Sequence, residues 1–95
     1  MARLVFSPRA NADLEEIGDY IARDNPVRAA SFVEELHKHC VAILAAPASY
    51  APREELGAGV RMAVHGRYLI LFRANAEFVR IERVLHSARR RPRSV

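Results

Sequence analysis

Residues 68–72 (YLILF) are apolar at every position, unlike the mixed sequences on either side of them. A strand with one solvent-exposed face alternates apolar and polar residues, whereas a strand covered on both faces does not need to. We therefore expect this run to be the central strand of a small sheet. Residues 60–64 and 78–85 are the neighbouring strand candidates, joined to it by short turns at 65–67 and 73–77.

The first half of the chain has the residue spacing of two amphipathic helices. Ser7 and Pro8 mark the start of the first helix, with serine as N-cap and proline at the first helical position. Asn25 and Pro26 repeat this arrangement for a second helix of about twenty residues that stops before Pro47. Apolar residues recur every three or four positions, at Ala10, Leu14, Ile17 and Ile21 and then at Ala29, Phe32, Leu36, Cys40 and Ile43. The short connection predicts an antiparallel helical hairpin.

Three further segments complete the pattern. Residues 3–6 are a short strand candidate, and residues 48–59, which contain proline and glycine, are expected to form an irregular loop. The last strand breaks its alternation at Arg83, which has the parity of its apolar neighbours. Either a bulge shifts the register there, or that face of the strand is only partly buried.

The order of elements is therefore β-α-α-β-β-β in one domain, residues 1–95, with a basic C-terminal tail at about 89–95. We expect an α+β fold of two layers, with the helical hairpin packed on one face of a small, mainly antiparallel sheet. The central strand is apolar on both sides, yet one hairpin covers only one face. The opposite face has no evident cover within the chain except the tail, which favours a protein partner lying across it.

Charge is distributed unevenly along the sequence. Residues 1–56 hold six Lys or Arg and nine Asp or Glu, while residues 57–95 hold nine Arg and two Glu. This polarity predicts an acidic partner for the second half, either a nucleic acid or an acidic protein segment. Fourteen of the fifteen cations are arginine, which pairs with carboxylate or phosphate through two parallel hydrogen bonds. A GC-rich genome, encoding arginine in place of lysine, is the competing explanation.

Several classes of protein are disfavoured by the sequence. No apolar run approaches the ~20 residues of a membrane span, and the N-terminal apolar run is too short for a signal peptide, so we expect a cytoplasmic protein. The single cysteine, Cys40, forms no internal disulfide and has the spacing of a buried helix residue. His37 and Cys40 share a helix face without a third ligand, so no metal site is predicted. No phosphate-binding loop or dinucleotide fingerprint is present, and no cofactor is expected.

Four local patterns together resemble the ParE/RelE superfamily of bacterial toxins. They are FSPRANADLEEIGDYIA at the start, the long second helix ending in LAAP, the GVR that opens the strands, and RYLILFR followed by VRIERVLHSARR. The resemblance covers essentially the whole chain. The closing IERVLHSARR is similar to the ParE branch, whose members are also described as plasmid stabilisation proteins.

The resemblance implies the toxin of a type II toxin–antitoxin system. A ParE-type toxin is expected to inhibit DNA gyrase by binding, without covalent chemistry, and to be neutralised in a hetero-oligomer by a ParD-type antitoxin. The DNA-binding part of the antitoxin would connect the toxin to DNA indirectly. The alternative from the RelE branch is a ribosome-dependent mRNA endonuclease. A third possibility is a degenerate toxin that survives only as half of a DNA-binding autorepressor complex.

The two main alternatives use different residues. For a metal-free nuclease, the candidates for acid, base and phosphate-binding groups are His65, Arg67, Arg83 and His86. His86 is followed by Ser-Ala-Arg and not by the aromatic residue typical of the RelE branch, so a structural role at the strand end is favoured for it. For a binding toxin, the residues expected to contact antitoxin or target are Arg61, Arg67, Arg73, Arg80, Arg83, His86, Arg89 and Arg90.

Overall fold

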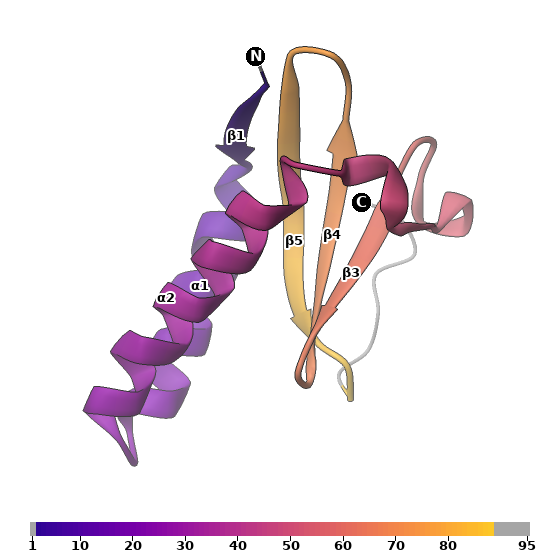
Figure 1. Cartoon of the computed structure of the whole chain (residues 1–95). Coiled ribbons are helices and arrows are strands. Elements are labelled where there is room, and N and C mark those ends of the chain that lie inside the picture. The colour runs from indigo at the N-terminus through magenta and orange to yellow at the C-terminus, as the bar shows by residue number, and fades with distance from the viewer. Residues whose placement is uncertain (1, 89–95) are drawn as a thin grey trace.

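The computed structural model describes residues 2–88 and confirms the two-layer α+β architecture. Two helices lie side by side on one face of a five-stranded sheet whose strand order is β1-β5-β4-β3-β2 (Figure 1). The elements are β1 Arg3–Phe6, α1 Pro8–Ala22, α2 Pro26–Ile43, β2 Ala51–Pro52, β3 Arg61–His65, β4 Tyr68–Ala74 and β5 Phe78–His86. No helix among the described residues is both long and apolar enough to span a membrane.

Both helix starts form as the sequence predicts. Ser7 Oγ accepts a hydrogen bond from the Ala10 N–H at 2.9 Å, and Asn25 Oδ1 accepts one from the Arg28 N–H at 3.0 Å. These bonds satisfy amide groups that have no partner within the first helical turn. The Ser7 hydroxyl also donates to the Glu82 carbonyl at 2.7 Å. One side chain thus starts α1 and fixes it to β5.

The sheet is antiparallel except at one edge. β1 runs parallel to β5, with Arg3 opposite Phe78 and Phe6 opposite Ile81. Between β4 and β5 the register shifts: Phe72 lies opposite Ile81 and Leu71 lies opposite Arg83, so Glu82 is an extra residue. The predicted irregularity beside Arg83 is therefore a bulge, which re-aims the side chains on either side of it.

The main core lies between the helices and the sheet. Phe72, Ile70 and Ile81 on the sheet and Leu36 and Ile43 on α2 are each fully buried there. Cys40 is 1% exposed among them, and burial raises the pKa of its thiol to about 11. It is thus a small buried apolar residue, as its helical position predicts, and not a reactive thiolate.

The expectation that only the tail could cover the other sheet face is wrong. The segment expected to be an irregular loop contains β2 and two 3₁₀ turns, Pro47–Ser49 and Glu54–Leu56. The second turn places Leu56 against Val60 and Leu71, with Met62 and Leu85 packed beside them. A short loop thus buries the outer side of the central strand because one leucine in it points back at the sheet.

Candidate interaction surface

Two of the predicted binding arginines form a network on the sheet. Arg73 and Arg80 lie opposite each other on β4 and β5, and both pair with the carboxylate of Glu82. The Arg73 Nη1–Glu82 Oε2 distance is 2.6 Å and the Arg80 Nε–Glu82 Oε1 distance is 3.0 Å. Arg73 Nε also donates to the Ala58 carbonyl at 2.9 Å. These contacts connect the loop at Ala58 to the bulge at Glu82, whose side chain is mostly buried. They also occupy N–H donors of Arg73 and Arg80 that would otherwise be available to a binding partner.

Arg83 is also engaged within the chain. Its Nε and Nη2 donate to the two oxygens of Asp13 on α1, at 2.8 Å and 3.0 Å. The same carboxylate accepts a hydrogen bond from the Val84 N–H at 2.9 Å. This N–H lies beyond the end of β1, where β5 pairs with β4 on one side and has no strand on the other. The Asp13 hydrogen bonds raise the pKa of Arg83 and fix α1 to the open edge of β5.

The remaining predicted arginines differ from these. Arg67 is exposed in the two-residue turn between β3 and β4, where Gly66 adopts a φ of 59°. Arg61 starts β3, is half-buried, and donates from Nη1 to the Tyr50 carbonyl at 2.7 Å. Arg61 and Arg67 form no ion pair with any of residues 2–88. Arg89 and Arg90 lie outside the described residues.

The two predicted histidines lie on either side of Tyr68, in a cluster that also includes His39 and Phe32. His65 and His86 are the cross-strand neighbours of Tyr68, and the Tyr68 and His86 rings meet edge to face at 5.1 Å. Phe32 of α2 packs against both His65 and Tyr68.

Each histidine of this cluster has a specific partner. His39 Nδ1 and His65 Nδ1 lie 2.9 Å apart, a hydrogen bond in which one ring donates and the other accepts. Burial, and then the charge of a protonated His65, lower the pKa of His39. His86 Nδ1 accepts the Ala88 N–H at 3.1 Å, a backbone contact at the end of β5. The arrangement joins α2 to the sheet and occupies one nitrogen of each ring.

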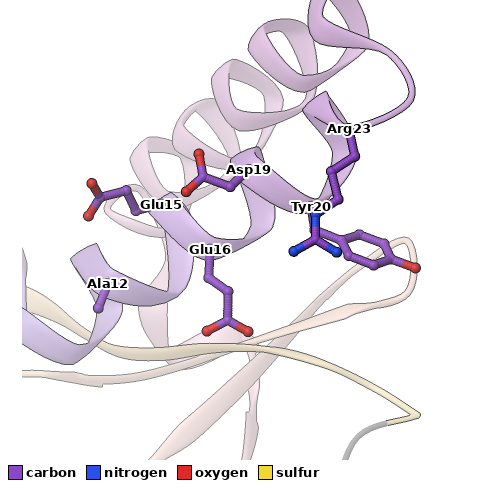
Figure 2. Close-up of a pocket in the computed structure, with 6 residues that line it drawn as sticks. All are labelled: Ala12, Glu15, Glu16, Asp19, Tyr20 and Arg23. Atoms are coloured by element: carbon purple, nitrogen blue, oxygen red, sulfur yellow. The ribbon is translucent and has the colours of Figure 1, made fainter.

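An acidic surface on α1 was not anticipated. Glu15, Glu16 and Asp19 project from the exposed side of the helix beside a cavity of about 520 Å³, which Tyr20 and Arg23 also line (Figure 2). The Arg23 guanidinium lies 5.9 Å from the centre of the Tyr20 ring. The spacing of four between Glu15 and Asp19, and again between Asp19 and Arg23, was the available signal. The molecule therefore carries negative charge on its helical layer and positive charge on its sheet.

A resident metal is not suggested by the side chains. Within residues 2–88, no three His, Cys, Asp or Glu side chains are grouped so that they could hold a metal ion. His37, which the sequence paired with Cys40, instead stacks on Phe6 with ring centres 5.8 Å apart.

Comparison with solved structures finds the same fold in a toxin–antitoxin system of P. aeruginosa and in YafQ of E. coli. The chromosomal ParDE toxin–antitoxin system of P. aeruginosa includes a chain of 22% identity, with a TM-score of 0.79 over 90% of this chain and 96% of that one. YafQ from E. coli strain BL21(DE3) is 17% identical, with a TM-score of 0.58 over 93% of this chain and 96% of that one. A chain of the E. coli DinJ–YafQ complex has 17% identity, the same coverage and a TM-score of 0.57.

Comparison with curated sequences finds no match, whereas comparison with family models identifies the chain. The model of the ParE toxin of the type II toxin–antitoxin system parDE matches residues 4–91, which is nearly the whole sequence. The match includes both helices, strands β2 to β5 with their arginine and histidine residues, and all of β1 except Arg3. This chain therefore belongs to the family of ParE toxins of type II toxin–antitoxin systems.

Proposed function

We propose that this ParE-family toxin acts by binding DNA gyrase, and that a ParD-type antitoxin neutralises it in a hetero-oligomeric complex. The observation that carries the proposal is the family match over residues 4–91. The similarity to a chain of the ParDE system of P. aeruginosa and to one of the DinJ–YafQ complex supports an antitoxin partner. The proposal places the chain in the cytoplasm, where gyrase acts on the chromosome, and connects it to DNA through the antitoxin.

Contacts within the chain support binding over catalysis. A catalytic acid or base must present its titrating atom to the substrate, and a phosphate-binding arginine must present its donors. The guanidinium of Arg83 is held by Asp13, and His65 shares a hydrogen bond with His39. Three of the four nuclease candidates, Arg83, His65 and His86, already have partners in the folded chain.

The nuclease alternative has one observation in its favour. His65, Tyr68 and His86 form a row across three strands, with Arg67 in the adjoining turn. Two imidazoles on either side of a phenol could exchange a proton with a bound ribose if the ring contacts opened. A RelE-type mRNA endonuclease is therefore the second candidate function, and it is tested in the same experiment as the first.

The decisive experiment measures both activities on the same preparation. We expect purified protein to inhibit supercoiling by DNA gyrase and to leave mRNA intact in a translating extract. The variant H65Q should inhibit gyrase as the parent does, because His65 is a candidate for the nuclease and is not among the residues expected to contact the target. If the parent cleaves mRNA and does not inhibit gyrase, and the variant has lost the cleavage, the protein is a nuclease instead. A chain with neither activity that represses its own promoter together with its antitoxin would be the degenerate toxin.

The antitoxin part of the proposal needs a separate measurement. The protein encoded by the neighbouring reading frame should bind the toxin and restore gyrase activity at equal concentrations. Association between an arginine-rich sheet and an acidic segment is accelerated by electrostatic attraction, so its rate should fall strongly as salt rises. A rate constant that stays the same between low and high salt contradicts the electrostatic part of the proposal.

A further inference from the structure

Arg61 of β3 differs from the arginines of β4 and β5. Arg73, Arg80 and Arg83 each pair with a carboxylate of this chain, whereas Arg61 pairs with no carboxylate among residues 2–88. Its position is nevertheless fixed, because Nη1 donates to the Tyr50 carbonyl at 2.7 Å. A guanidinium has five N–H donors, so this single bond orients the group and leaves donors for another molecule.

The guanidinium lines an open cleft of about 330 Å³. Two lining residues, Pro47 and Ala48, belong to the first 3₁₀ turn. Three others, Ala74, Asn75 and Ala76, lie at the end of β4 and in the turn that leads to β5. No acidic residue lines the cleft, and Arg61 is its charged member.

Asn75 adds hydrogen-bond donors to the same cleft. Its Oδ1 accepts from the N–H groups of Glu77 at 2.8 Å and Phe78 at 2.9 Å, which closes the turn. The carbonyl end of the amide is therefore occupied, and the amino end is the part with bonds to offer. The Arg61 guanidinium and the Asn75 amino group can bind an anion, and the alanine and proline side chains beside them leave room for a short aliphatic chain attached to it.

This chemistry favours a carboxylate over a nucleic acid backbone. Arginine binds carboxylate through two parallel N–H···O bonds, and small walls admit the methylene groups of an aspartate or glutamate. A phosphodiester chain is instead held by several cations along a groove, usually with aromatic side chains for the bases. The cleft has one cation and no aromatic lining residue.

We propose that the Arg61 cleft receives one acidic side chain, glutamate or aspartate, from the antitoxin. The inference rests on the proposed function, since it names a contact within that complex. It also separates Arg61 from Arg73, Arg80 and Arg83, whose carboxylate partners are already supplied by the chain itself.

The test is the affinity of the full-length toxin for the protein encoded by the neighbouring reading frame, measured by calorimetry. R61Q should weaken binding by about 10- to 100-fold, the usual effect of losing a charged hydrogen-bonded pair. R61K keeps the charge but not the planar pair of donors, and should fall between R61Q and the parent. R53Q is the matched control, because Arg53 also donates to a backbone carbonyl, that of Pro52, but lies outside the cleft.

The outcomes separate this inference from the proposed function. If R61Q and R53Q bind as tightly as the parent, the cleft inference is wrong and the antitoxin proposal stands. If the parent itself does not bind the neighbouring protein, the antitoxin proposal fails. The cleft is then tested directly with glutarate, which should shift the Arg61 Nε–H signal in an NMR titration of the parent. No shift overturns the inference.

Two further measurements guard the interpretation. Thermal unfolding of R61Q checks that loss of the Tyr50 contact has not unfolded the toxin, and R61K serves as the second variant if it has. Binding of a twelve-residue oligothymidylate is measured on the same proteins. A loss of oligonucleotide affinity in R61Q, with unchanged affinity for the antitoxin, would assign the cleft to phosphate and overturn the carboxylate proposal.

Discussion

The two faces of the sheet are covered in very different ways. On the inner face, two long helices lie over Phe72, Ile70 and Ile81, which are fully buried. On the outer face, one 3₁₀ turn lays Leu56 over Val60 and Leu71. A pair of helices is stiff, whereas a loop can close over a missing side chain. We infer that packing on the inner face supplies most of the free energy of unfolding. On the outer face, the loop that carries Leu56 should be able to rearrange with a smaller loss of stability.

The largest expected effect is on the inner face. Phe72→Ala removes a ring that is fully buried and meets Tyr50 edge to face at 5.6 Å. The helices cannot collapse into the space, so the free energy of unfolding should fall by about 3–5 kcal/mol. Urea unfolding measures this, with V64A as control because Val64 is 59% exposed and should cost little. A loss near 1 kcal/mol for Phe72→Ala would mean that the helices can move to fill the space left by the ring.

The next effect concerns the fixing of the helices to the sheet. Asp13→Ala leaves Arg83 without its carboxylate and the Val84 N–H without an acceptor, which should cost about 3 kcal/mol. Asp13→Asn keeps an oxygen acceptor but loses the charge, so its cost should be smaller. Both are measured by urea unfolding at neutral pH. Equal losses in the two variants would show that the charge, and not the backbone hydrogen bond, is the part that matters.

The outer face should respond less. Leu56→Ala removes a buried residue of the 3₁₀ turn, and we expect a loss of about 2 kcal/mol, at the lower end for a leucine because the loop can relax. Amide exchange should quicken in residues 53–60 while the helices keep their protection. A loss as large as that of Phe72→Ala would erase the distinction between the two faces.

The smallest effect is a pH dependence of the contact between α2 and β3. The pKa of His39 is lowered in the folded chain, chiefly by burial, so protonation favours the unfolded state. The stabilisation from neutral His39 is complete above about pH 6.5, the ordinary value, and is lost as pH falls through the lower folded value. We expect a loss below about 1 kcal/mol, since the ring is partly exposed.

The measurement for His39 is unfolding by urea at a series of pH values. His39→Gln should flatten the curve below about pH 6.5, whereas Lys38→Gln on the exposed side of the same helix should not. The same slope in the parent and in His39→Gln would assign the pH dependence to other groups.

Local chemistry explains which parts of the fold the sequence predicts. The N-caps at Ser7 and Asn25, the run at residues 68–72 and the irregularity at Arg83 each depend on neighbours in the chain, and each forms as expected. The prediction of an irregular loop at residues 48–59 was wrong because a two-residue strand has no periodicity to detect. The same is true of a single leucine, Leu56, that packs against the sheet. Parallel pairing of β1 with β5 likewise leaves no local pattern.

The candidate site was harder to predict for a related reason. The sequence identifies the arginines of the strands as candidate binding residues. Whether each is free to bind another molecule depends on acidic residues that are distant in sequence or are placed by the bulge. Asp13 is seventy residues from Arg83, and Glu82 reaches Arg73 and Arg80 from the bulge position. Only a structure distinguishes these paired arginines from Arg61. The spacing of acidic residues on α1 was visible in the sequence, and the acidic surface could have been predicted.

The parallel pairing of β1 with β5 also bears on how the chain reaches its folded state. β5 lies between β1 and β4, so the sheet joins one end of the chain to the other. Closing a loop of some seventy-five residues costs about 4 kcal/mol of chain entropy, whereas the turns between β3, β4 and β5 cost far less. We expect the three-stranded meander to form early and β1 with α1 to dock last. On a growing chain, β1 and α1 are made first but cannot dock on the sheet until residues 78–86 have emerged from the ribosome.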